Sequence, residues 1–323
     1  MARHRHSSPS RIPRYLAFGT VAALAGTIGF THAGSGSQTG GNPVRTAAAV
    51  TAVPSPSATA SAQDDAPGDV AADLAADVEA AVREAVAGAE GNAAVAVLDL
   101  STGASASAGT AGATDHEFDT ASIVKVDILA ALLLQTADAG RALTAQERQW
   151  ATVMIENSDN AAANALWDAI GGGQGLAKAN TRLGLTETVP GDGAYWGLTQ
   201  TTPDDQLRLL RAVFSEDSVL SADARAYLQS LMGSIAADQN WGISAAADDP
   251  GAAQLKNGWL ARSGTGLWVT NSIGRVEVSG HTLLLAVLCD DQKSQETGMA
   301  LVEDLAVAAS RPFEDGVEAG GDE

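Results

Sequence analysis

Cysteine, aromatic residues and positive charge are all scarce in this chain. The single cysteine, Cys289, excludes an internal disulfide. It lies in an apolar run that is typical of a buried strand, so we expect a small core side chain and not a nucleophile. Aromatic residues make up only 4% of the 323 residues, so the core must be built from aliphatic side chains and alanine. The formal net charge of −20 argues against nucleic acid and anionic membrane as partners.

Patterns that would bind a metal or a nucleotide are also missing. Outside the N-terminal stretch the only histidines are His116 and His281, which stand alone in the sequence. No glycine-rich loop precedes a helix that carries a lysine, so a phosphate-binding loop is not indicated. The sequence therefore predicts no metal and no cofactor. We expect the chain to be a monomer.

The first 68 residues have the composition of an export signal followed by a linker. Four arginines precede an uncharged, mostly apolar run over residues 15–30, and small residues allow cleavage after Ala33. We expect residues 1–33 to be a signal peptide, which makes the protein secreted or extracytoplasmic without stable membrane insertion; an uncleaved N-terminal anchor is the alternative. Residues 34–68 are predicted to be a disordered linker, and residues 311–323 an acidic flexible tail.

Residues 69–310 are predicted to form one domain. Apolar periodicity predicts a helix near each end, at 70–87 and 295–309, and an all-helical middle. Strands are predicted in two groups that flank this middle: 92–100 and 104–108, then 253–259, 267–276 and 282–289. The two groups share a sheet only if the terminal parts of the domain meet. We therefore expect an α+β, sandwich-like fold, with an antiparallel sheet flanked by the terminal helices and packed on a helical half.

Two of the four lysines stand in positions that indicate chemistry. Lys125 follows Ser122 by three residues in a predicted helix at 122–139, so the two side chains share a face. A serine hydroxyl becomes a nucleophile when a base takes its proton, and a lysine is such a base once burial or a nearby cation lowers its pKa. The alternative is a surface serine beside a solvated lysine, but the apolar neighbours Val124 and Val126 favour burial.

A second polar group, Ser158-Asp159-Asn160, lies between two predicted helices. A serine hydroxyl at this point can relay a proton to a leaving nitrogen, and an asparagine can hold both a lysine and a substrate amide. The alternative is simple helix capping, for which these residue types are well suited.

A third group, Lys256-Asn257-Gly258, lies on a predicted strand. A cation here would meet a substrate carboxylate. The glycine would let the backbone approach the substrate, so that the amide of Trp259 faces a reacting carbonyl. The alternative is a lysine on an edge strand with no role in chemistry. Arg262, in Arg262-Ser263-Gly264, offers a competing register for the cation, although that stretch has the composition of a hairpin turn.

In this order the three motifs resemble those of the penicillin-recognising serine hydrolases, most closely the class A β-lactamase family. The resemblance covers about residues 69–309. It implies that Ser122 forms an acyl-enzyme with β-lactams or D-alanyl peptidoglycan-type amides, with Lys125 as base or proton relay. It further implies that Ser158 protonates the leaving nitrogen.

The same resemblance implies how a substrate is held. Asn160 would position the substrate, and Lys256 would attract its carboxylate. The amides of Ser122 and Trp259 would form the oxyanion hole, beside Asn257 and Gly258. The implied substrate is therefore a small molecule or a fragment derived from peptidoglycan.

Two departures from the family pattern affect these expectations. The glutamate that class A enzymes carry in the omega loop is missing: aligned on Pro-Gly-Asp at 190–192, Arg182 falls at the catalytic position, and Glu187 falls where the family has a different acid. Without a positioned base an acyl-enzyme turns over slowly. Asn257 also replaces the usual Thr or Ser of the Lys-x-Gly motif.

Three hypotheses therefore stand. The chain is a serine hydrolase of β-lactamase type, a slow or inactive muropeptide- or β-lactam-binding protein, or a structural protein whose motifs are coincidental caps. The rate at which an acyl-enzyme releases its product separates the first two. The structural hypothesis predicts that replacing Ser122 changes nothing.

Overall fold

The computed structural model describes residues 67–314. The predicted signal peptide at 1–33, nearly all of the predicted linker and most of the predicted tail lie outside the described residues. Helix α1 (Pro67–Ala85) opens the described chain and helix α8 (Gln295–Glu314) closes it. Among the described residues, no helix combines the length and the apolar character needed to cross a membrane.

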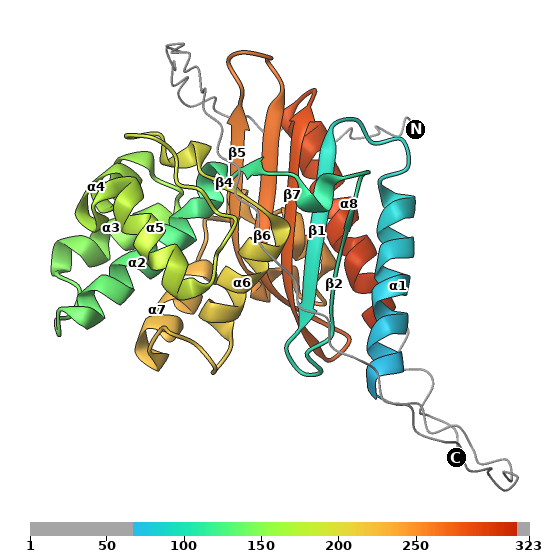
Figure 1. Cartoon of the computed structure of the whole chain (residues 1–323), viewed down its shortest axis with the longest axis horizontal. Coiled ribbons are helices and arrows are strands. Elements are labelled where there is room, and N and C mark those ends of the chain that lie inside the picture. The colour runs from blue at the N-terminus through green and yellow to red at the C-terminus, as the bar shows by residue number, and fades with distance from the viewer. Residues whose placement is uncertain (1–66, 315–323) are drawn as a thin grey trace, which may run out of the picture. The chain divides into compact units, whose positions relative to one another are not determined.

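A five-stranded antiparallel sheet stands at the centre of the fold (Figure 1). Its order is β2-β1-β7-β6-β5, with bounds β1 Asn92–Asp99, β2 Ser105–Gly109, β5 Gln254–Ala261, β6 Trp268–Val278 and β7 His281–Gln292. Strand β1 pairs with β7, Val95 opposite Val287. The early and late strands thus share one sheet, which confirms the predicted α+β fold. Strand β5 lies at one edge, where one side of its backbone is free to face another element.

Each face of the sheet is covered by helices (Figure 1). Helices α1 and α8 pack on one face over an aliphatic core that includes Val95, Leu285 and Val302. The other face packs on the helical half, which comprises α2 Val124–Asp138, α3 Ala145–Glu156, α4 Asn160–Ile170, α5 Gly172–Leu183, α6 Pro203–Phe214 and α7 Ala222–Met232. Because strand residues alternate between faces, one sheet serves both cores.

Helix α2 runs through the middle of the helical half. Twelve of its fifteen residues are buried, from Val124 to Thr136. A helix that is apolar nearly all round belongs in a protein interior, and this one takes Lys125 and Asp127 into the interior with it. The burial of Lys125 is thus a consequence of the sequence around it.

Local signals fix the helix ends. Thr144 caps α3 in a capping box with Glu147, and Asp159 accepts a hydrogen bond from the amide of Ala162 to cap α4. Gly171, in the left-handed conformation at φ 91°, ends α4. Helix α5 begins directly after it, at Gly172.

Two other boundaries differ from the predictions. The helix predicted to start at Ser122 starts at Val124, because residues 121–123 form a separate 3-10 turn, η2 (Ala121–Ile123). The final helix was predicted to end at Ala309, with a flexible tail from Arg311. Instead α8 continues to Glu314, because Phe313 is buried against the sheet-side core. The hydrophobic contact at Phe313 outweighs the helix-breaking tendency of Pro312.

Candidate active site

Ser122 lies in the η2 turn just before α2, half-buried, with the edge strand β5 beside it. A Cβ placed on Gly258 would lie 2.7 Å from the Ser122 amide nitrogen and 2.8 Å from the Thr120 carbonyl oxygen. Only a glycine therefore lets β5 come so close to the turn. The residue before the serine, Ala121, has φ 47°. A non-glycine residue in this region stores strain of about 1–3 kcal/mol, which is typical of functional turns.

Lys125 is fully buried on the first turn of α2. Its Nζ donates to the Ser158 carbonyl oxygen at 2.6 Å, to Ser158 Oγ at 3.0 Å and to Asn160 Oδ1 at 2.8 Å. Burial, together with the charge of nearby Lys256, lowers the pKa of Lys125 to about 6. At neutral pH this amine is therefore mostly uncharged. In that form it donates in only two of the three contacts and can accept a proton at its lone pair.

Lys256, on the edge strand β5, reaches the same serine. Its Nζ donates to Ser158 Oγ at 3.1 Å and to the carbonyl oxygen of Asn257 at 2.8 Å. The side chain is fully buried, and burial lowers its pKa to about 7. Of the two candidate cations, Lys256 and Arg262, it is Lys256 that shares the Ser158 hydroxyl with Lys125.

Ser158 connects the two lysines and has a strained backbone. It lies between α3 and α4 with φ 55°, a left-handed conformation that serine rarely adopts. Its Oγ lies within hydrogen-bond distance of both Lys125 Nζ and Lys256 Nζ. Among the described residues, no carboxylate accepts a hydrogen bond from either lysine. The cluster is therefore a pair of amines linked through one hydroxyl.

A salt bridge anchors the segment that leads to the nucleophile. Arg262, at the end of β5, pairs with Asp119, and Gln200 donates to the same carboxylate. Asp119 belongs to the short strand β3 (Phe118–Asp119), which pairs with β4 (Gln200–Thr201), a two-stranded sheet that the sequence did not predict. Asn271 on β6 donates to the Asp119 and Thr120 carbonyl oxygens at 2.9 and 3.0 Å. Arg262 is thus engaged in holding the Ser122 segment.

Two further side chains lie beside the buried lysines: the indole of Trp196 and the amide of Asn164. The sequence analysis identified neither. Trp196 lies in the short 3-10 turn η3 (Trp196–Leu198), with its ring centroid 5.0 Å from Lys125 Nζ. Its Nε1–H donates to Asn164 Oδ1 at 2.7 Å. The one available signal was spacing, because Asn164 follows Asn160 by four residues and so lies on the same face of α4.

Glu187, in the loop before η3, and Arg182, near the end of α5, both have partners away from the buried lysines. Glu187 accepts from Thr202 Oγ1 at 3.2 Å and lies 3.8 Å from Arg208, while its amide donates to Asp205. Arg182, which aligns with the missing glutamate, pairs with Asp138 at 2.7 Å on the surface. Neither residue forms a hydrogen bond or an ion pair with Lys125, Ser158 or Lys256.

Two predicted substrate-binding residues point away from Ser122. The Asn257 amide is buried and donates to the Gln239 and Trp241 carbonyl oxygens at 2.7 and 3.0 Å. The Trp259 ring packs on Trp241, with 5.9 Å between centroids. Strand alternation explains both, since Lys256 and Gly258 face the helical half. The side chain of Asn257 is therefore not a candidate substrate contact. The backbone amide of Trp259 remains one.

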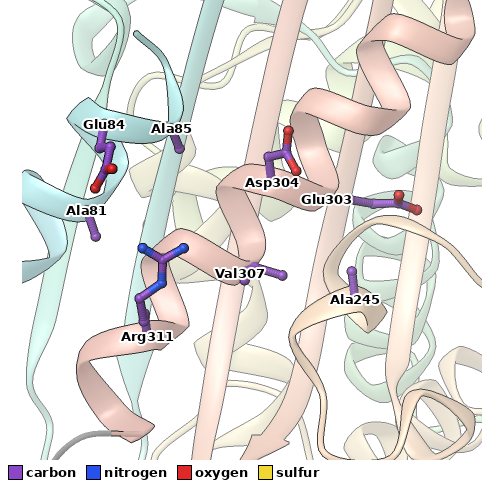
Figure 2. Close-up of a pocket in the computed structure, with 8 residues that line it drawn as sticks. All are labelled: Ala81, Glu84, Ala85, Ala245, Glu303, Asp304, Val307 and Arg311. Carbon is purple, nitrogen blue, oxygen red and sulfur yellow. The ribbon is translucent and has the colours of Figure 1, made fainter.

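A groove of about 440 Å³ lies elsewhere, between α1 and α8. Figure 2 shows Glu84 on α1 and Glu303, Asp304 and Arg311 on α8 around it. None of Ser122, Lys125, Ser158 and Lys256 lines this groove. Its lining carries three carboxylates and one guanidinium, with no buried polar group directed into it, so it is not a candidate active site.

Comparisons with known proteins agree with this arrangement. The family model described as "Beta-lactamase enzyme family" matches residues 134–313, more than half of the chain. The matched stretch includes Ser158 and Lys256 and begins after Lys125. Among curated proteins, the chain is 34% identical over 111 residues to the "Putative lipoprotein LppW" of Mycobacterium tuberculosis and of Mycobacterium bovis. The alignment spans 34% of this chain and about a third of the length of those relatives.

Solved structures share the fold at low identity. A class A β-lactamase from Bacteroides cellulosilyticus is 14% identical with a TM-score of 0.62, over 75% of this chain and 99% of that one. A β-lactamase from Chitinophaga pinensis is 20% identical with a TM-score of 0.61, over 75% and 99%. A mutant of PBP-A, in an acyl-enzyme complex with penicillin G, is 22% identical with a TM-score of 0.62, over 74% and 97%.

Proposed function

Since the chain belongs to the β-lactamase enzyme family, we propose that it forms an acyl-enzyme at Ser122 with β-lactams or with D-alanyl amides of the peptidoglycan type. The observation that carries this proposal is the pair of buried lysines, Lys125 and Lys256, which share the Ser158 hydroxyl beside the Ser122 turn. Two buried amines without a carboxylate partner cost stability, so their presence indicates a chemical role.

In the proposed reaction Lys125 is the base. Its lowered pKa leaves the amine neutral near pH 7, so it takes the proton from Ser122 Oγ while that oxygen bonds to the amide carbon of the substrate. The carbon–nitrogen bond then breaks. The proton passes from Lys125 through the Ser158 hydroxyl to the leaving nitrogen, which restores the neutral amine and leaves the acyl group as an ester on Ser122.

Substrate positioning follows from the edge strand and α4. The amides of Ser122 and Trp259 would donate to the developing oxyanion, since Gly258 brings β5 against the turn. Protonated Lys256 would attract a substrate carboxylate, and the exposed Asn160 would hold the substrate amide. With Asn257 turned away and Arg262 paired with Asp119, carboxylate recognition depends on Lys256 and the Ser158 hydroxyl.

The proposed location is outside the cytoplasm, where peptidoglycan fragments and β-lactams are met. This is supported by the basic and apolar N-terminal stretch and by the curated relatives, which are described as lipoproteins. Cys289, the single cysteine, lies in β7, so lipid attachment at a cysteine after the N-terminal run is excluded for this chain.

A second candidate function is capture without useful turnover. It is favoured by the contacts of Glu187, which accepts a hydrogen bond from Thr202 and lies 3.8 Å from Arg208, so this carboxylate is engaged away from Lys125 and Ser158. The acylation step is the same in both functions, and the fate of the ester distinguishes them.

Intact mass spectrometry tests the proposal. The chain is mixed with a penicillin and with a chromogenic cephalosporin, beside Ser122→Ala and the control Ser230→Ala, which alters an exposed serine on α7. We expect an adduct of one penicillin mass on the wild type and the control and none on Ser122→Ala. Steady colour release with a transient adduct would indicate a hydrolase, and a lasting adduct would indicate capture. An adduct on Ser122→Ala, or none on the wild type, would contradict the proposal.

A further inference from the structure

The indole of Trp196 lies over the amine of Lys125, at 5.0 Å from ring centroid to Nζ. The three hydrogen-bond acceptors of this amine are polar atoms of Ser158 and Asn160, whereas the ring belongs to η3. An apolar ring face therefore lies against an amine that is fully buried in the fold. The proposed mechanism assigns no role to this contact.

The loop that carries Trp196 is held in place by several contacts. Trp167 Nε1–H donates to the Gly193 carbonyl oxygen at 2.8 Å, and the Gly191 amide donates to Thr199 Oγ1 at 3.1 Å. A Cβ on Gly191 would lie 2.1 Å from the Tyr195 carbonyl oxygen, so the loop closes tightly on itself. Asn164, on α4, accepts a hydrogen bond from the indole, so α4 also helps to hold the ring over Lys125.

A water molecule between the ring and the amine would lack partners. The only polar group of the indole, Nε1–H, is already committed to Asn164. An ordered water needs two to four polar partners, and the ring face offers none. The side of the base under the ring is therefore a poor place for a water to be held and activated.

We infer that Trp196 shields the catalytic base from water and so makes the acyl-enzyme long-lived. This inference rests on the proposed acylation of Ser122. Hydrolysis of the ester needs a water whose oxygen attacks the acyl carbon while a base in reach takes its proton; the acyl carbon–Oγ bond then breaks and Oγ regains a proton. Lys125 is the base available, and the indole keeps water from it. The chain thus captures lactam-type amides and releases them slowly.

The decay of a preformed adduct tests this role. The full chain is acylated with penicillin, excess drug is removed, and the adduct is followed by intact mass for the wild type, Trp196→Ala and Trp150→Ala. Trp150 is a half-buried indole on α3 and serves as the matched control. We expect decay in Trp196→Ala to be about ten-fold faster or more, because base-activated water gains access. Trp150→Ala should decay as the wild type does.

The possible outcomes distinguish a failure of the shielding role from a failure of the proposed acylation. An adduct that forms on the wild type but decays no faster in Trp196→Ala overturns the shielding role alone. A wild type that forms no adduct overturns the acylation proposal together with it. If Trp196→Ala does not fold, Asn164→Ala is used: it keeps the indole but frees it, and decay must again accelerate, otherwise the inference fails. A general loosening of the fold would accelerate decay in Trp150→Ala too, and that result also overturns it.

Discussion

Replacing Lys125 with methionine should make the fold more stable while it abolishes acylation. In the unfolded chain this amine has its ordinary pKa of 10.5, but in the folded protein burial and Lys256 lower the pKa to about 6. At pH 7 the chain must therefore give up a proton to fold. Removing this proton costs about 1.4 kcal/mol for each of the roughly 3.5 pH units between 7 and 10.5. The free energy of folding is therefore made less favourable by at most about 5 kcal/mol.

The measured gain will be smaller than this ceiling. Methionine leaves the acceptors on Ser158 and Asn160 without their donor, which costs about 1–3 kcal/mol in total. A net stabilisation of about 2–4 kcal/mol remains, and it should raise Tm by several degrees for a domain of this size. The exposed Lys178 on α5 provides the control, and Lys178→Met should leave Tm nearly unchanged.

The pH dependence of the gain identifies its cause. Between pH 6 and 10.5 the unfolded wild type binds a proton that the folded wild type does not, so wild-type stability rises with pH. Lys125→Met lacks this titration, so its advantage should shrink from pH 6 to pH 10 in urea unfolding series. A variant that is less stable than the wild type at pH 7, or an advantage that stays constant over this range, would refute the reasoning.

Further predictions concern the pH profile, the salt bridge and the thiol. The acylation rate should fall as pH drops through about 6, where Lys125 becomes protonated, and as pH rises above about 7, where Lys256 loses its charge; stopped-flow acylation measures both limbs. Asp119→Ala should lower the free energy of unfolding by about 1–3 kcal/mol and slow acylation, since Arg262 loses its partner. Cys289, fully buried with a raised pKa, should resist thiol reagents until urea unfolds the chain.

The sequence allowed the sheet and most helices to be predicted because their signals are local. The apolar run around Cys289 predicted the β7 strand, and the apolar periodicity at 70–87 predicted helix α1. The sharing of one sheet by β1 and β7 followed from the order of the elements. The β3–β4 pair was missed because two-residue strands leave no periodic pattern to detect.

The hydrogen-bonded group of Lys125, Ser158 and Lys256 combines residues from three short motifs that the sequence singled out, and their catalytic role with Ser122 stays a proposal. What the sequence could not provide was side-chain direction. Asn257 was expected to contact a substrate, but the alternation of β5 turns it to the face of α8. Trp196 was missed because a lone tryptophan in a loop carries no signal, and only the folded loop brings it over Lys125.

The central claim is that Ser122 carries the acyl group. The most direct test is to quench the chain in acid after brief exposure to penicillin, digest it, and locate the added mass by peptide sequencing in a mass spectrometer. The account predicts the penicilloyl mass on Ser122, and its loss from the same peptide in Lys125→Met. Penicilloyl mass on any other serine, or an unmodified Ser122 peptide at saturating penicillin, would contradict it.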